Sequence, residues 1–220
     1  MVSSPVLFLL RRGISCPPTS LVILVFLACL PFLLSPPSAS GSEYSSDTAA
    51  IGAAFLTHLF MHELGHQVVA EEAGADAPQM HFMSRKNGKF YPGISTYKDI
   101  SKESKLSYAA GGERMAGYTF EYALDSYQRE PTTYNKALMF FSCTDFLWYT
   151  LLANYVHPGN DNYDPNIIRE ETGLSREALL GVVLTKSLLN AYRVYNEDAK
   201  FMPMVTLDTR SVGLMVRYDF

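Results

Sequence analysis

Two histidines four residues apart, embedded in an apolar stretch, constrain the fold of this chain most. The pentapeptide His62-Glu63-Leu64-Gly65-His66 follows residues 49–61, which are almost wholly apolar, and the apolar pattern continues to residue 70. On a helix, residues four apart lie on nearly the same face, so both imidazoles can reach one metal ion. Unpaired polar groups in a buried helix cost about 1–3 kcal/mol each. Since one ion satisfies both rings, the stretch predicts a buried helix that carries a metal site.

Glu63 lies between these two histidines and gives the motif its chemistry. The pattern His-Glu-x-x-His is typical of zinc-dependent hydrolases, in which the glutamate acts as general base. It takes a proton from water at the open position of the metal and passes it to the leaving group. A polar patch on an exposed helix is the alternative, and the apolar flanks of the motif argue against it. The motif therefore predicts Zn²⁺ as the cofactor and Glu63 as the catalytic residue.

The motif supplies only two of the three protein ligands that catalytic zinc normally takes. His58 lies one turn before His62, but it is eight residues from His66, or about 12 Å of helical rise. We therefore expect His58 to be a neighbour of the site and not a ligand. Two further histidines, His81 and His157, would indicate a closed, structural site if either lay beside the pair.

Asp145 is the favoured third metal ligand, because it is the only charged residue in the apolar range 137–156. A lone carboxylate in such a helix is costly without a cation. The alternative for Asp145 is a set of hydrogen bonds from nearby hydroxyls. Glu113 and Glu121 are alternative ligands: Glu113 follows Gly111-Gly112, which allows close helix approach, and Glu121 precedes an aspartate by one turn. The alternative for Glu121 is an ordinary amphipathic helix that exposes its acidic residues to water.

The first 41 residues have the organisation of a secretory leader. Arg11 and Arg12 occur without any acid, an apolar run covers residues 21–34, and residues 35–41 are small and rich in helix breakers. This order predicts a signal peptide at 1–41, with an uncleaved N-terminal anchor as the alternative, and one domain at 42–220. Of three cysteines, only Cys143 lies beyond the leader, so no internal disulfide forms. Export without disulfides indicates a bacterial envelope protein, periplasmic or membrane-associated.

Charge and hydropathy limit the kinds of partner that the chain can bind. The net charge is −4, and it becomes −6 without the two leader arginines. This balance excludes a simple nucleic-acid interface. The apolar ranges 49–70 and 137–156 fit either an intramembrane placement or the core of a soluble domain, so membrane association stays open. A peptide or protein substrate is expected, and the oligomeric state is undecided.

The remaining pattern predicts a mainly α (α+β) fold. Asn87-Gly88 is a strong hairpin signal within residues 79–96, and alternating apolar residues predict a second hairpin near the C-terminus. Asp47 or Thr48 is a candidate cap for the first helix, and Gly173 is a candidate helix end. The expected helices cover residues 48–74, 101–127 with a break at Gly111-Gly112, 134–156, 164–172 and 175–195.

The order of these segments resembles two groups of zinc proteases, the site-2 protease family and the FtsH-type membrane proteases. The resemblance covers about residues 48–156 and consists of the His62–His66 motif, the small-residue segment Ala109-Ala110-Gly111-Gly112-Glu113 and then Asp145. It implies a zincin-like helical domain in which a distant helical aspartate completes the metal site. The chain lacks the Asn-x-x-Pro and Leu-Asp-Gly signature of the first group and the phosphate-binding loop of the second.

Together these features predict a metalloprotease, a zinc-dependent hydrolase that cleaves peptide bonds in the envelope or at the membrane. The alternative is a catalytically inactive metal-binding scaffold or chaperone-like envelope protein. An open coordination position favours the enzyme, and a fourth protein ligand favours a structural site.

Overall fold

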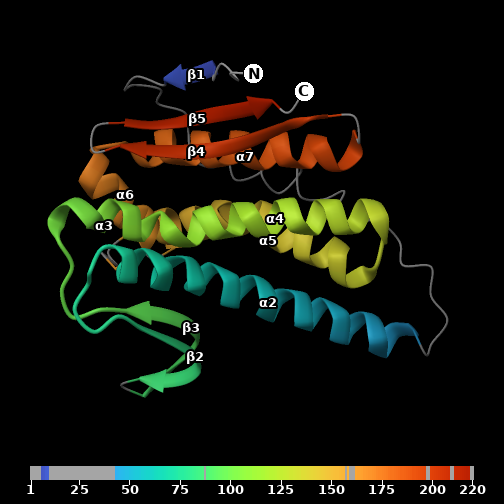
Figure 1. Cartoon of the computed structure of the whole chain (residues 1–220), viewed down its shortest axis with the longest axis horizontal. Coiled ribbons are helices and arrows are strands. Elements are labelled where there is room, and N and C mark those ends of the chain that lie inside the picture. The colour runs from blue at the N-terminus through green and yellow to red at the C-terminus, as the bar shows by residue number, and fades with distance from the viewer. Residues whose placement is uncertain are drawn as a thin grey trace.

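A computed structural model shows a mainly helical molecule with two small antiparallel hairpins (Figure 1). It describes residues 6–9, 43–86, 88–156, 158, 162–196, 199–208 and 211–218. The fold class predicted from the sequence is confirmed at this level. Its elements are β1 (Val6–Leu9), α2 (Glu43–Glu72), β2 (Gln79–Lys86), β3 (Lys89–Thr96), α3 (Lys102–Ala109), α4 (Gly111–Arg129), α5 (Thr133–Leu151), the π-helix η1 (Leu152–Val156), α6 (Asp164–Thr172), α7 (Arg176–Tyr195), β4 (Phe201–Asp208) and β5 (Ser211–Tyr218).

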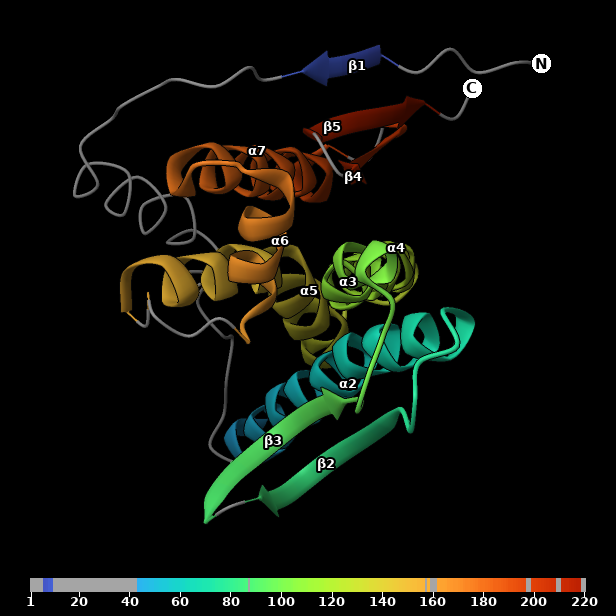
Figure 2. The same cartoon turned by 90° about the vertical axis from the view of Figure 1, so that its left-hand side faces the viewer.

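The elements form stacked layers (Figures 1 and 2). Helix α2 and the β2–β3 hairpin make one outer layer, α4 and α5 lie in the middle, and α7 with β4 and β5 lies on the other side. Helices α2, α4 and α5 pack on one another pairwise, and α7 packs on α5. The middle layer therefore carries the core, and α2 reaches it along one face only.

Local sequence signals set most of the element boundaries. Gly88 lies between β2 and β3 in the left-handed region at φ 76°, and Lys86 is opposite Lys89 in the register. Gly173 ends α6 in the left-handed conformation at φ 67°, where glycine has no Cβ to clash. The Ser175 hydroxyl accepts a hydrogen bond from the Ala178 amide and caps α7. The hairpin at 79–96 and these helix ends were all predicted from the sequence.

Three features of the fold differ from those expected. Helix α2 begins at Glu43, before the predicted start, and Asp47 accepts a hydrogen bond from the Thr133 hydroxyl at 2.7 Å instead of capping the helix. The last turn of the predicted 134–156 helix is the π-helix η1. Strand β1 lies within the predicted leader and pairs antiparallel with β5, which also pairs with β4. The rest of the leader lies outside the described residues.

Two apolar clusters hold the layers together. One joins α5, α6 and α7 and includes Phe146, Leu147, Ile168, Leu180 and Val183. The other joins α2, α4 and α5 and includes Ala54, Phe120, Ala123, Leu138 and Met139. Within the described part of the chain, no helix combines the length and the hydropathy needed to cross a bilayer.

Candidate metal centre

Helix α2 carries four polar side chains into the interior. His58, His62, Glu63 and His66 are all buried, although the helix around them is apolar. The spacing of four residues places the three imidazoles along one side of the helix, facing α4 and α5. Since buried polar groups must find partners, the contacts of these rings define the site.

Helices α2 and α4 cross at their glycines. A Cβ on Gly111 would lie 2.6 Å from the Gly65 carbonyl oxygen, a distance that real Cβ atoms do not reach. One residue later, a Cβ on Gly112 would lie 2.6 Å from Nε2 of His66 and closer still to Nε2 of His62. The break at Gly111-Gly112 therefore allows close approach, as the sequence predicted, and Gly112 leaves free the space in front of both imidazoles.

Three buried ligand atoms converge at this point. Nε2 of His62 lies 3.2 Å from Nε2 of His66, and Oδ2 of Asp164 lies 3.1 Å from His66 and 3.8 Å from His62. Asp164 is the first residue of α6, so the group joins two helices far apart in the sequence. His62, His66 and Asp164 form a buried group that can hold a metal ion.

The hydrogen bonds of the imidazoles show that this group needs a cation. Nδ1 of His66 lies 2.7 Å from the Tyr108 carbonyl oxygen, which can only accept, so this nitrogen donates. Nδ1 of His62 lies 2.7 Å from Oδ2 of Asp145 and donates in the same way. In their neutral forms both rings therefore turn an Nε2 lone pair toward the Asp164 carboxylate. Two lone pairs and an anion repel one another unless a proton or a metal ion lies among them.

The separations fit a small tetrahedral ion. Ligands at about 2.0–2.1 Å from one zinc ion are about 3.3 Å apart in a tetrahedron. The observed separations of 3.1, 3.2 and 3.8 Å bracket this value. Two imidazoles and a carboxylate are also a usual donor set for catalytic zinc.

Asp145, the favoured third ligand in the sequence, lies on the other side of the His62 ring. Its Oδ2 contacts Nδ1 of His62, and its Oδ1 lies 3.0 Å from Nε2 of His58. The two nitrogens of an imidazole point apart, so Asp145 does not belong to the group of three. His58 lies one contact further out, as the helical spacing predicted. The lone carboxylate of α5 does have partners, but they are the imidazoles of His58 and His62 and not a metal.

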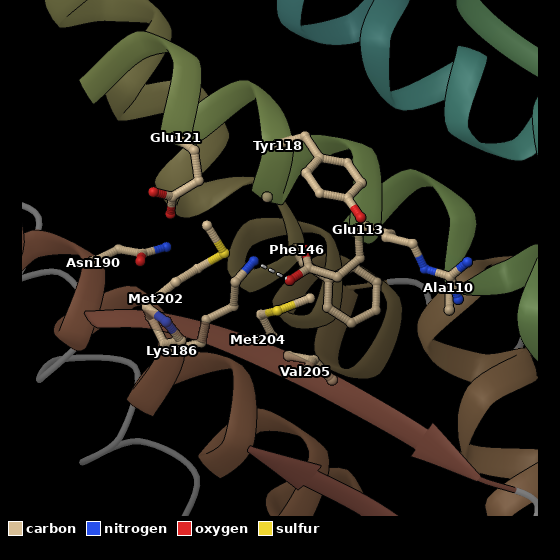
Figure 3. A pocket seen from close by; sticks show the side chains of 13 residues that line it. Ala110, Glu113, Tyr118, Glu121, Phe146, Lys186, Asn190, Met202, Met204 and Val205 are labelled. Carbon is tan, nitrogen blue, oxygen red and sulfur yellow. Dashed lines mark hydrogen bonds and ion pairs between the residues drawn. The ribbon is translucent and has the colours of Figure 1, made fainter. Parts of the chain in front are cut away.

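The alternative ligands Glu113 and Glu121 are engaged elsewhere. Glu113 is buried and forms an ion pair with Lys186, and Figure 3 shows the two side chains turned toward each other between α4, α7 and β4. Glu121 is bound by both terminal nitrogens of Arg193, one of them at 2.6 Å. Both glutamates therefore face α7, whereas Gly112 faces the imidazoles.

Of the histidines that would have closed the site, His81 lies on β2 and is not part of the group. His157 lies outside the described residues. Among the described residues the group has three members.

Glu63 lies where α2 meets the hairpin. Its side chain contacts Gly93 of β3, where an added Cβ would lie 2.8 Å from Cγ of Glu63 and 3.3 Å from Oε1. The hydroxyl of Ser95 donates to the Glu63 carbonyl oxygen at 2.9 Å and fixes the strand against the helix. A side chain at position 93 would therefore clash with Glu63, and glycine leaves space for its carboxylate.

Burial and charge perturb the titrating groups of the site. Burial alone would lower the pKa of His62, but the carboxylates of Asp145 and Asp164 outweigh it and raise this pKa well above 6.5. Burial would raise the pKa of Asp145 and of Asp164, yet the neighbouring imidazoles hold both below their usual value. Burial, with Asp164 and Glu63 nearby, raises the pKa of Tyr108 and Tyr149, so both phenols stay neutral.

Asp164 was not recognised as a ligand in the sequence. Its neighbour Pro165 reads as part of an ordinary helix start, and Asp164 and Pro165 do begin α6. Its carboxylate is buried against His62 and His66 of α2, a contact between distant segments that no local pattern reveals. Comparison of the chain with protein-family models, curated proteins and solved structures finds no match.

Proposed function

We propose that this protein is a zinc-dependent peptidase of the cell envelope. The observation that carries the proposal is the convergence of His62, His66 and Asp164 at separations close to those around a tetrahedral ion, with Glu63 next to His62 in the sequence. In this proposal Asp164, and not Asp145, is the third protein ligand of the zinc ion. The envelope location rests on the predicted leader.

The metal accounts for one part of the chemistry. If bound by two imidazoles and a carboxylate, a zinc ion would supply Lewis-acid chemistry, lowering the pKa of a water molecule and polarising a carbonyl. Three residues of the chain would hold it, and two more would orient the rings: Asp145 through Nδ1 of His62, and the Tyr108 carbonyl through Nδ1 of His66. Such outer contacts fix the tautomer of each ring and its direction.

Glu63 carries the proton in this mechanism. It accepts a proton from the attacking water and donates it to the departing amine, so that one carboxylate serves both halves of the hydrolysis. Burial and the contact with Gly93 restrict its side chain. Strand β3 runs beside Glu63, and its backbone offers an extended peptide the means to align by strand addition.

The test combines metal content with hydrolysis of an unfolded protein such as casein. Wild type should bind about one zinc ion and cleave the substrate, and His62→Ala should lose the metal. Glu63→Gln should keep the metal and lose about 10²–10⁴-fold in rate. Glu71→Gln, an exposed change on the same helix, is the matched control.

Two results would contradict the proposal. If Glu63→Gln hydrolysed the substrate at the wild-type rate, Glu63 would not be the base. If wild type bound zinc stoichiometrically but cleaved neither casein nor a random peptide library, the metal-binding scaffold would be the correct function.

A further inference from the structure

A cavity lies between α4, α7 and β4, on the side of α4 that faces away from the imidazoles (Figure 3). Its volume is about 80 Å³. A single water molecule needs about 10–15 Å³ of such space, so the cavity can hold several waters or one small organic molecule. The side chains that line it include Glu113, Lys186, Asn190, Phe146, Met202 and Met204.

Lys186 brings more hydrogen-bond donors to this cavity than its partner uses. The side chain is only 6% exposed, and its ammonium group carries three N–H donors. Within the described part of the chain, its one hydrogen-bonding partner is Glu113 on α4. Gly117 leaves space beside the ammonium, since an added Cβ there would still lie 3.7 Å from Nζ. A buried ammonium therefore has at least one N–H group that the described residues do not satisfy.

Asn190 on α7 supplies a second donor. Its side chain is 1% exposed, and its Oδ1 accepts a hydrogen bond from Arg193 at 3.5 Å, which identifies the other end of the amide as the NH₂ group. Figure 3 shows this nitrogen turned toward Met202 and Lys186. Among the described residues, none accepts a hydrogen bond from it. The cavity thus collects donors that need an acceptor.

The charges around the cavity favour a ligand with one negative charge. The Glu113 carboxylate is paired with Lys186. The Glu121 carboxylate is bound by both terminal nitrogens of Arg193. A cationic ligand would therefore meet only carboxylates that are already neutralised. Arg114 also lines the cavity and has no ion-pair partner in the described part of the chain, which leaves one positive charge uncompensated.

The wall of the cavity that β4 provides is apolar. Met202 and Met204 are two residues apart on the strand, so both side chains project from the same face. Phe146 of α5 lines the same space. Thioether side chains are flexible and polarizable, and they adapt to apolar groups of different shape. This wall therefore suits an alkyl chain.

We propose that this cavity binds a short-chain aliphatic carboxylate. The carboxylate group would accept hydrogen bonds from Lys186 and Asn190, and the alkyl chain would pack against Met202, Met204 and Phe146. A neutral hydrocarbon would leave the buried N–H groups without an acceptor, at a cost that disfavours it. A doubly charged anion such as phosphate would exceed the single uncompensated charge.

The test follows methionine methyl groups by NMR in the full chain labelled with ¹³C-methyl methionine. During titration with a series of acids from acetate to hexanoate, the methyl signals of Met202 and Met204 should shift and saturate. The best acid should bind with a Kd on the order of 0.1–1 mM. The amide and the amine of the same chain length should bind about tenfold or more weakly. Met202→Leu and Met204→Leu assign the two signals.

Met115 is the internal control. Its Cβ lies on the α2 side of α4, where a Cβ added to Gly65 would be 2.8 Å from it. Carboxylates also coordinate metal ions, so a carboxylate that binds at the metal centre should shift the Met115 methyl signal. Binding in the cavity should leave this signal in place.

Two sets of substitutions test the contacts. Glu113→Leu combined with Lys186→Met removes the buried charges together and should abolish binding. Arg114→Gln, an exposed change at the cavity, should weaken binding about two- to fivefold. Arg129→Gln, an exposed change at the end of the same helix, should bind as wild type does.

Several results would overturn the proposal. If no acid of the series shifts the Met202 or Met204 signal, the cavity holds water only. Equal affinity for the amine or the amide would exclude carboxylate recognition, and so would wild-type affinity in the double variant. Wild-type affinity in Arg114→Gln would also overturn it, so the test does not depend on the folding of the double variant. None of these changes alters the metal group, so the outcome is independent of the peptidase proposal.

Discussion

The carboxylate of Asp145 lies 2.7 Å from Nδ1 of His62, on the side of the ring that faces away from Asp164. One imidazole is thus held between two carboxylates, of which only Asp164 belongs to the group that can take a metal. The contact fixes the tautomer of His62, because a carboxylate beside Nδ1 requires the proton there and leaves Nε2 for the metal.

The two aspartates should therefore respond differently to substitution. Asp164→Ala removes a ligand and should abolish stoichiometric zinc binding. Asp145→Asn removes only the orienting charge and should lower zinc affinity about 10–100-fold. Chelator competition measures both, with Asp125→Asn, an exposed partner of Arg129, as control. Equal losses for Asp145→Asn and Asp164→Ala would contradict the separate roles.

Gly112 should be intolerant of any side chain. A methyl group there would meet Nε2 of both histidines, whose rings are held by Asp145 and the Tyr108 carbonyl and cannot turn aside. Gly112→Ala should lose zinc and lower stability by about 1–3 kcal/mol through overpacking. Gly181→Ala on α7, with nothing within 4 Å, should raise stability by up to about 1 kcal/mol. Zinc content and urea unfolding are measured for both variants. Full zinc content in Gly112→Ala would contradict the view that Gly112 leaves the space for the ion in front of the two imidazoles.

The stability of the metal-free protein should fall as the pH rises. The pKa of His62 is raised in the folded state, so protonated His62 stabilises the fold. This stabilisation is complete below the unfolded value of about 6.5 and is lost as the pH rises through the raised pKa. Zinc binds the neutral ring, so the loaded protein should not show this loss. Melting temperatures with chelator and with zinc across the neutral and alkaline range measure the difference, and His62→Gln should flatten the chelated profile.

The buried pair of Glu113 and Lys186 should behave as a unit. Either single change, Glu113→Gln or Lys186→Met, leaves a buried group without its partner and should cost about 3–5 kcal/mol. Glu113→Leu combined with Lys186→Met should recover most of that loss, because an apolar pair of similar volume avoids burying charge. Urea unfolding gives the three values. Zinc content should stay at the wild-type level in the double variant. Loss of zinc would indicate that Glu113 is a metal ligand after all.

The sequence predicted the features that depend on neighbouring residues. Gly88 lies at the turn of a hairpin, Gly173 ends a helix and Ser175 caps one, each through contacts within four residues. The two histidines of the motif could be found in the same way, because helical spacing alone places them together.

The third member of the site depends on distant contacts. The sequence favours Asp145 because a lone carboxylate in an apolar helix needs polar partners, and it has them in the imidazoles of His58 and His62. Asp164 follows a polar loop, where a carboxylate needs no explanation. Only the contacts of Asp164 with His62 and His66 of α2 show that this carboxylate is buried in the site.

The separation of Asp164 from the two histidines bears on how the molecule assembles. Asp164 lies 98 positions after His66, and α3, α4 and α5 intervene along the chain. The three members of the group therefore come together only after α6 has docked, and tight binding of an ion would require that step. Slow release of a bound zinc ion would then lower the rate at which the folded protein unfolds.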